Sequence, residues 1–110
     1  MGLTRLSLKA LSINQAYQGR KFATPELKTY KMIVHAMLPK IKKPEGKLTL
    51  FLRFGMSSKQ SDVDNCVKCF QDCLAEKYGF NDKMIYKLEV EKVDCVRGAE
   101  FIEFSIEKYV

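Results

Sequence analysis

The sequence predicts a small α/β domain: a mixed sheet of about four strands with two helices packed on it, in the order β-α-β-α-β-β. Three observations lead to this prediction. Four short segments alternate apolar and polar residues, as half-buried strands do, and two longer segments repeat apolar residues at helical spacing. A chain of 110 residues can also bury one modest core without disulfides or metals. We therefore expect residues 1–110 to form a single domain.

The strands are predicted where the alternation is regular. The clearest case is the run from Leu48 to Phe54, in which every second side chain is a large apolar one. The same pattern, with fewer repeats, predicts the other strands. The four predicted strands are residues 6–10, 48–54, 86–90 and 102–106.

The two helices are predicted from their ends as well as from their periodicity. Thr24 followed by Pro25 is typical of an N-cap and a first helical position, and Pro39 ends that helix near residue 38. The second helix is expected from about residue 64 to residue 77, with Gly79 as its stop signal.

The segment between the first strand and the first helix is expected to be a polar connector. It holds Asn14, Tyr17, Arg20 and Lys21 around Gly19. These side chains can offer amide, phenol and cationic donors to a phosphate backbone. Composition alone slightly favours a plain surface loop.

The segment Ser-Asp-Val-Asp-Asn-Cys-Val-Lys, residues 61–68, lies between the second strand and the second helix. If the helix begins near this point, helical spacing puts Asp64, Lys68 and Asp72 one turn apart, opposite an apolar stripe. Asp62 would lie just before the first turn, beside free backbone N–H groups. The segment thus places carboxylates and a lysine on one rigid element.

Clustered carboxylates stay ionised together only when a cation lies between them. Oxygen ligands with no histidine nearby indicate Mg²⁺, with Mn²⁺ as a substitute, rather than zinc. Such an ion can activate water against a phosphodiester while Lys68 offsets the phosphate charge. From the spacing alone a plainer interpretation is favoured, in which Asp62 or Asp64 is an N-cap and Lys68 an exposed i,i+4 partner.

The charge of the chain indicates an acidic partner. Its formal net charge is +6, and nucleic acid is the commonest partner of such a protein. The run of residues 40–47 is a basic turn that contains Lys42 and Lys43, and Lys59 precedes the acidic segment. No apolar run is long enough to span a membrane, so we expect a cytoplasmic protein with no membrane partner. We also expect no small-molecule cofactor.

The cysteines are expected to be reduced. Cys66, Cys69 and Cys73 fall along one flank of the second helix, and Cys95 lies on a later strand. A zinc site would need another ligand, and the only histidine is His35. Thiols that pack as small hydrophobic side chains are the favoured interpretation, and a zinc module is the weaker one.

The run Asp62-Val63-Asp64-Asn65, together with Lys68, Asp72 and Leu74 and the later Asn81-Asp82 and Ile85, resembles the signature of the RusA family of Holliday-junction resolvases. The early Asn14 and Tyr17, with Gly19-Arg20 and the helix that holds Tyr30, are similar to the N-terminal part of that family. The resemblance covers most of the chain.

The resemblance implies a small homodimeric endonuclease that uses Mg²⁺ to nick four-way DNA junctions symmetrically. It implies that Asp62, Asp64 and Asp82 are metal ligands, and that Lys68 is the catalytic lysine. Asn65 and Asp72 are expected to support the site. The residues expected to contact DNA are Asn14, Tyr17, Arg20, Lys21, Lys42, Lys43 and Lys59.

The chain departs from the family pattern at two points. Family members usually have two aspartates where this chain has Asn81-Asp82, so Asp82 must be the functional acid. Some relatives carry several arginines before the acidic segment, where this chain offers Lys59 and Arg53. A non-catalytic basic DNA-binding protein that keeps the fold is the alternative, in which the carboxylates are caps.

Overall fold

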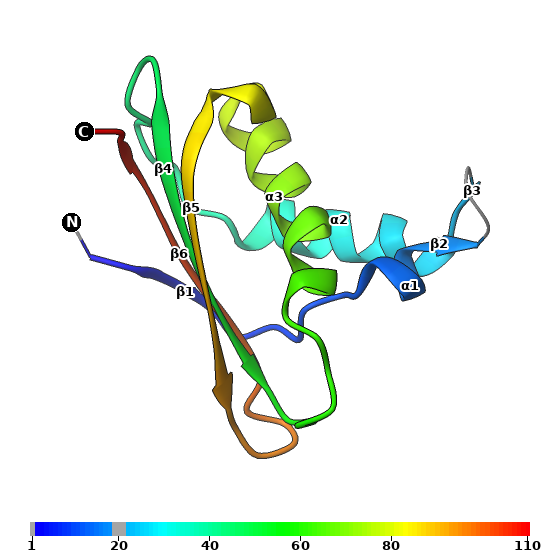
Figure 1. Ribbon diagram of the computed structural model, residues 1–110. Coiled ribbons are helices and arrows are strands. Elements are labelled where there is room, and N and C mark those ends of the chain that lie inside the picture. The colour runs from blue at the N-terminus through cyan, green and yellow to red at the C-terminus, as the bar shows by residue number, and fades with distance from the viewer. Residues whose placement is uncertain (1, 19–21) are drawn as a thin grey trace.

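A computed structural model describes residues 2–18 and 22–110. In this part of the chain, four strands form one sheet and a separate two-stranded ribbon pairs β2 with β3. The helices α1, α2 and α3 all lie on one face of the sheet (Figure 1). The elements are β1 (Thr4–Leu6), α1 (Ile13–Ala16), β2 (Tyr17–Gln18), β3 (Phe22–Ala23), α2 (Pro25–Met37), β4 (Leu48–Met56), α3 (Asp64–Tyr78), the 3₁₀ helix η1 (Asp82–Met84), β5 (Ile85–Asp94) and β6 (Phe101–Lys108).

The four-stranded sheet has the order β1-β6-β4-β5 and is mixed, as the sequence predicts. β4 and β5 run parallel, whereas β6 is antiparallel to both β4 and β1. Parallel neighbours need a crossover connection, and α3 supplies it. The carboxyl end of β4 therefore leads through residues 57–63 into the start of α3. In open α/β sheets this is the end of the strands where ligands bind.

The core lies between the sheet and the helices. Phe54 on β4, Phe104 on β6 and Phe70 on α3 are fully buried. The ring of Phe70 meets those of Phe54 and Phe104 edge to face, at centroid distances of 6.3 and 5.7 Å. These contacts fix how α3 lies on the sheet, and with it the direction in which the first turn of α3 points.

Both predicted helices are confirmed, as are the predicted start of α2 and the predicted stop of α3. The hydroxyl of Thr24 accepts a hydrogen bond from the backbone N–H of Leu27 at 3.3 Å, and Pro25 is the first residue of α2. Gly79 ends α3 in the left-handed conformation at φ 70°, which costs a residue without a Cβ little.

The prediction of the first strand is wrong in its position. Residues 4–6, rather than 6–10, pair with β6, with Leu6 opposite Ile102. The alternation of Leu6, Leu8 and Ala10 has another cause, because Leu8 and Ala10 are packed against the core from an irregular segment.

The described residues of the polar connector form more secondary structure than predicted, because they contain α1, β2 and β3. Ser12 and Gln15 form a capping box at the start of α1, in which each side chain bonds the other residue's backbone N–H. Thr24 then joins α1 to α2, since its hydroxyl donates to the carbonyl of Gln15 at 2.7 Å. Among the described residues, α1 is accordingly a short α-helix beyond the two predicted, and η1 adds a 3₁₀ turn.

The cysteines of α3 are core residues, as predicted. Cys66, Cys69 and Cys73 are buried, and all four cysteines of the chain are free thiols. Within the described residues, no helix has both the length and the apolar character needed to cross a membrane.

Candidate active site

Lys68 on α3 gathers two carboxylates from different elements. Its ammonium nitrogen lies 2.9 Å from Oδ1 of Asp72, one turn further along α3, and 3.2 Å from Oδ2 of Asp82, the first residue of η1. Asp72 is a neighbour by helical spacing alone. Asp82, in contrast, is 14 residues away in sequence, and the fold brings it to Lys68.

The return of the chain after α3 explains the position of Asp82. Gly79 reverses the chain in the left-handed conformation, and η1 then packs beside α3. The side chain of Asn81 caps η1 by accepting a hydrogen bond from the backbone N–H of Lys83 at 3.0 Å. Asn81 thus holds Asp82 in place by capping.

The two carboxylates keep Lys68 charged. The hydrogen bond to Asp72, with a smaller contribution from Asp82, raises the pKa of Lys68 above its usual value, and partial desolvation opposes this only in part. Lys68 therefore carries a fixed positive charge at neutral pH. A fixed ammonium is what stabilises charge that builds up on a phosphate.

Asp62 and Asp64 lie at the entrance to α3, and both are exposed. Asp64 is the first residue of the helix, and Val63 occupies the N-cap position without a side-chain hydrogen bond. The interpretation of Asp62 or Asp64 as an N-cap is therefore wrong, whereas the i,i+4 pairing of Lys68 with Asp72 is confirmed. Among the described residues, neither Asp62 nor Asp64 forms an ion pair.

The structure does not bring all the predicted ligands together. Asp82 is held at Lys68, while Asp62 and Asp64 lie outside that ion-paired group. Across residues 2–18 and 22–110, no three His, Cys, Asp or Glu side chains are close enough to one another to hold a metal ion. The metal-ligand set stays a prediction.

The segment of residues 57–61, which leads to Asp62, is tied down at both ends. At its start, the hydroxyl of Ser57 donates to Glu100 at 2.7 Å, and this bond lowers the pKa of Glu100. At its end, the ammonium of Lys92 donates to the carbonyl oxygens of Lys59 at 3.0 Å and Ser61 at 2.7 Å. The backbone before Asp62 is thereby attached to β5.

Sequence reasoning missed Lys92 and Glu100. A signal for Lys92 was present, because the alternation of β5 puts it in phase with Leu88 and Val90, on the face that the helices cover. A lysine at such a position needs partners inside the fold, since burying a charge without them is costly. For Glu100 the sequence carries no comparable signal.

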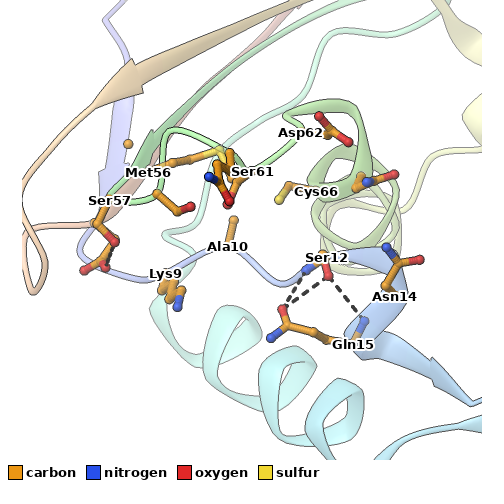
Figure 2. A pocket seen from close by; sticks show the side chains of 15 residues that line it. Lys9, Ala10, Ser12, Asn14, Gln15, Met56, Ser57, Ser61, Asp62 and Cys66 are labelled. Atoms are coloured by element: carbon orange, nitrogen blue, oxygen red, sulfur yellow. Dashed lines mark hydrogen bonds between the residues drawn. The ribbon is translucent and has the colours of Figure 1, made fainter.

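A polar pocket of about 350 Å³ opens beside the start of α3. Asp62, Asn65 and Cys66 form one part of its wall, and Asn14 is another wall residue. Figure 2 shows the side chains of Asn14, Ser12 and Gln15 across the pocket from those of Asp62 and Cys66. One candidate ligand, one supporting residue and one candidate DNA contact therefore share a single cavity.

The other candidate DNA contacts lie at several places. Tyr17 is half-buried against the core, and Lys59 is exposed before Asp62. Lys42 is exposed between α2 and β4. The ammonium nitrogen of the neighbouring Lys43 lies 3.8 Å from Oε1 of Glu45. Arg20 and Lys21 lie outside the described residues.

One comparison with known proteins gives a match. The model of a family described as endodeoxyribonuclease RusA matches residues 7–103, nearly the whole chain. No curated protein matches the chain. The matched range includes the entrance to α3, Lys68 and η1, so the elements that carry the candidate site are part of what the family shares.

Proposed function

The chain belongs to the endodeoxyribonuclease RusA family and is a DNA endonuclease, and we propose that it resolves four-way DNA junctions by paired symmetric nicks that depend on Mg²⁺. The observation that carries this proposal is the convergence of Asp72 and Asp82 on Lys68, beside the exposed carboxylates at the entrance to α3. Asp62 and Asp64 follow the carboxyl end of β4, where ligands bind in α/β sheets, whereas Asp82 precedes the first residue of β5.

The side chains present fit a magnesium ion by their chemistry. Asp62, Asp64 and Asp82 would hold it, with Mn²⁺ as a substitute, because carboxylate oxygens are the ligands that both ions prefer. In the described part of the chain Asp62 and Asp64 form no ion pair, so their charge is available to a cation. When bound, the ion would supply an activated water and a counter-charge for the phosphate.

Lys68 stabilises the charge that develops on the cleaved phosphate. Its ammonium stays protonated beside Asp72 and Asp82, and it projects from a helix that the core holds rigidly. Asp72 acts as a positioning residue, since it holds the ammonium at 2.9 Å without being a proposed ligand. Asn65 supports the turn that carries the two aspartates, because its backbone N–H donates to the carbonyl of Asp62 at 3.2 Å.

A homodimer would give the enzyme one site for each of two opposite strands. A C₂ pair matches the two-fold symmetry of a four-way junction, so paired nicks with 5′-phosphate ends yield duplexes that a ligase can seal. The basic residues proposed to contact phosphates are Arg20, Lys21, Lys42, Lys43 and Lys59, with Asn14 and Tyr17 as polar contacts. Phosphate contacts of this kind make affinity fall steeply as salt rises.

Cleavage of a synthetic four-way junction tests the proposal. Wild-type protein with Mg²⁺ should cut two opposite strands, and Asp64→Asn should bind the junction without cutting it. Glu107→Gln is the matched control, because it neutralises an acid of β6 outside the candidate site and should cut as wild type does. If wild type binds but never cuts, the non-catalytic alternative holds; equal cutting by Asp64→Asn would remove the metal role of Asp64.

A further inference from the structure

The pocket beside Asp62 has a wall that is mostly neutral and polar. Its amide side chains are Asn14, Gln15, Gln60 and Asn65, and four serines also line it. Amides offer a donor and an acceptor side by side. That pairing matches the edge of a nucleobase, as asparagine and glutamine show when they bind adenine.

The charged groups of the pocket do not form an anion site. Among the described residues, Lys9 is the only cationic residue of its lining, and the same lining contains the carboxylates of Asp62 and Glu100. Glu100 is also engaged already, since it accepts bonds from Ser57 and from the backbone N–H of Gly98 at 2.8 Å. A phosphate would therefore gain little in this pocket, whereas a neutral ring with polar edges suits it.

Part of the lining is apolar and polarizable. Met56 and Cys66 bring sulfur atoms to the pocket, and Ala10 adds a methyl group, as Figure 2 shows. Sulfur makes favourable contacts with aromatic rings at about 5 Å, so these residues can cover the face of a base while the amides bind its edge. The volume of about 350 Å³ is at the small end for ligand sites and is suited to one base rather than to a duplex.

The position of the pocket ties it to the cut. Asp62 is both a wall residue and a proposed metal ligand, so the nucleotide bound here adjoins the phosphate that is cleaved. A base must leave its stack to enter such a pocket, and this costs least where pairing is already broken. The branch point of a junction is a place of that kind.

We propose that the pocket formed by α1, the 57–62 segment and the first turn of α3 receives the unstacked nucleobase next to the cleaved phosphate. This inference rests on the proposed nuclease function and adds a site for base recognition to it. The amide groups of Asn14 and Gln60 are the proposed contacts, because both side chains are exposed at the pocket and neither is engaged in a hydrogen bond among the described residues.

Junctions that carry a single abasic residue test this site. The residue is placed in turn at each position flanking the cut, and single-turnover cleavage is measured for wild type and for the double variant Asn14→Ala, Gln60→Ala. At one position the missing base should slow wild type about tenfold, as the loss of a good base contact does. The double variant should cut the intact junction about tenfold more slowly and show no further loss with that abasic junction.

A second measurement follows the base directly. 2-Aminopurine at the sensitive position should brighten when wild type binds the junction without divalent ions, and should not brighten with the double variant. Gln71→Ala is the matched control, an amide of α3 outside the pocket lining, and it should behave as wild type.

The outcomes separate the two proposals. If intact junctions are not cut, the proposed function fails. If they are cut but abasic residues have no effect at any position, or slow the double variant as much as wild type, the base-binding pocket is refuted while the nuclease stands. Brightening that the double variant retains also refutes it.

Discussion

Lys92 and Ser61, 31 residues apart, are joined by a hydrogen bond of 2.7 Å from the ammonium of one to the backbone carbonyl of the other. The same ammonium also donates to the carbonyl of Lys59. Because Asp62 follows Ser61 directly, a side chain of β5 sets the backbone position of a proposed metal ligand. We therefore propose Lys92 as a positioning residue for the proposed cleavage site.

Replacing Lys92 with methionine should slow cleavage without weakening binding. The change keeps an unbranched side chain one atom shorter but leaves two carbonyls without their donor, and hydrogen bonds to charged groups are worth about 1.5–3 kcal/mol when removed. We expect single-turnover cleavage to fall about tenfold, equivalent to about 1.4 kcal/mol, because Asp62 is less well placed. Junction affinity measured without divalent ions should stay within about twofold of wild type.

Two further variants show whether the effect is specific. Lys92→Arg restores a charged donor and should recover part of the rate. Lys87→Met removes another lysine of β5, one that pairs with Glu89 at 3.1 Å on the strand itself, and should cut normally. A Lys92→Met enzyme that cuts at the wild-type rate would show that the tether has no role in positioning.

Much of the fold could be predicted because the signals are local. The alternation in β4, the N-terminal cap of α2 and the glycine stop of α3 act within a few residues, and the structure shows them where the sequence places them. The prediction is wrong for the segment before α2, because a strand-like alternation and a helix-capping pattern lie close together in it. Leu6, Leu8 and Ala10 alternate like a strand, but β6 pairs with Thr4–Leu6, and the capping box of Ser12 and Gln15 was overlooked.

The contacts of the candidate site also divide into local ones, which the sequence predicts, and long-range ones, which it does not. The pair of Lys68 with Asp72 follows from helical spacing, so the sequence alone predicts it. The approach of Asp82 to Lys68 depends on the reversal at Gly79 and on the packing of η1, so only the family resemblance pointed to it. Lys92 is a contact between distant segments, and one sequence carries no direct record of such contacts.

Replacing Lys68 with glutamine should impair the chemical step. Removing one preorganised donor to a developing charge typically costs a factor of about 10²–10³ in kcat, and we expect a loss of that size in single-turnover cleavage. Asp72→Asn should cost less, about tenfold, because the ammonium is still held by Asp82. Lys68→Gln that cuts within about threefold of wild type would contradict the proposed role of Lys68 in charge stabilisation.

Replacing Gly55 with alanine should destabilise the fold. Gly55 lies opposite Phe101 in the sheet, and a Cβ at this position would overlap the aromatic ring, whose other contacts include the guanidinium of Arg5 at 3.9 Å. Overpacking of this kind costs about 1–3 kcal/mol, so the free energy of unfolding measured in urea should fall by that amount.

The cause of that loss can be tested with a second substitution. Phe101→Leu removes the ring and should make Gly55→Ala less costly in the double variant than in the wild-type background. Gly2→Ala is the control, because nothing lies within 4 Å of its added Cβ, and its stability should be unchanged. Equal costs in both backgrounds would mean that the ring is not the obstacle.

The Cys73 thiol makes the stability of the fold depend on pH in the alkaline range. Burial raises the pKa of the Cys73 thiol from 9.0 to about 12. Between these values the unfolded chain has lost a proton that the folded chain keeps. The free energy of unfolding is therefore at its full value below about pH 9 and falls as the pH rises toward 12, by about 1.4 kcal/mol per pH unit for this thiol.

Removing the thiol should remove this share of the pH dependence. Cys73→Ala should be less stable than wild type at pH 8, because it leaves a small cavity in the core. The difference between the two free energies of unfolding, measured in urea, should shrink steadily at pH 9, 10 and 11. Cys95→Ala is the matched control: Cys95 is only half-buried, so its difference from wild type should change less with pH. Parallel curves for Cys73→Ala and wild type would show that Cys73 ionises equally in the folded and unfolded states.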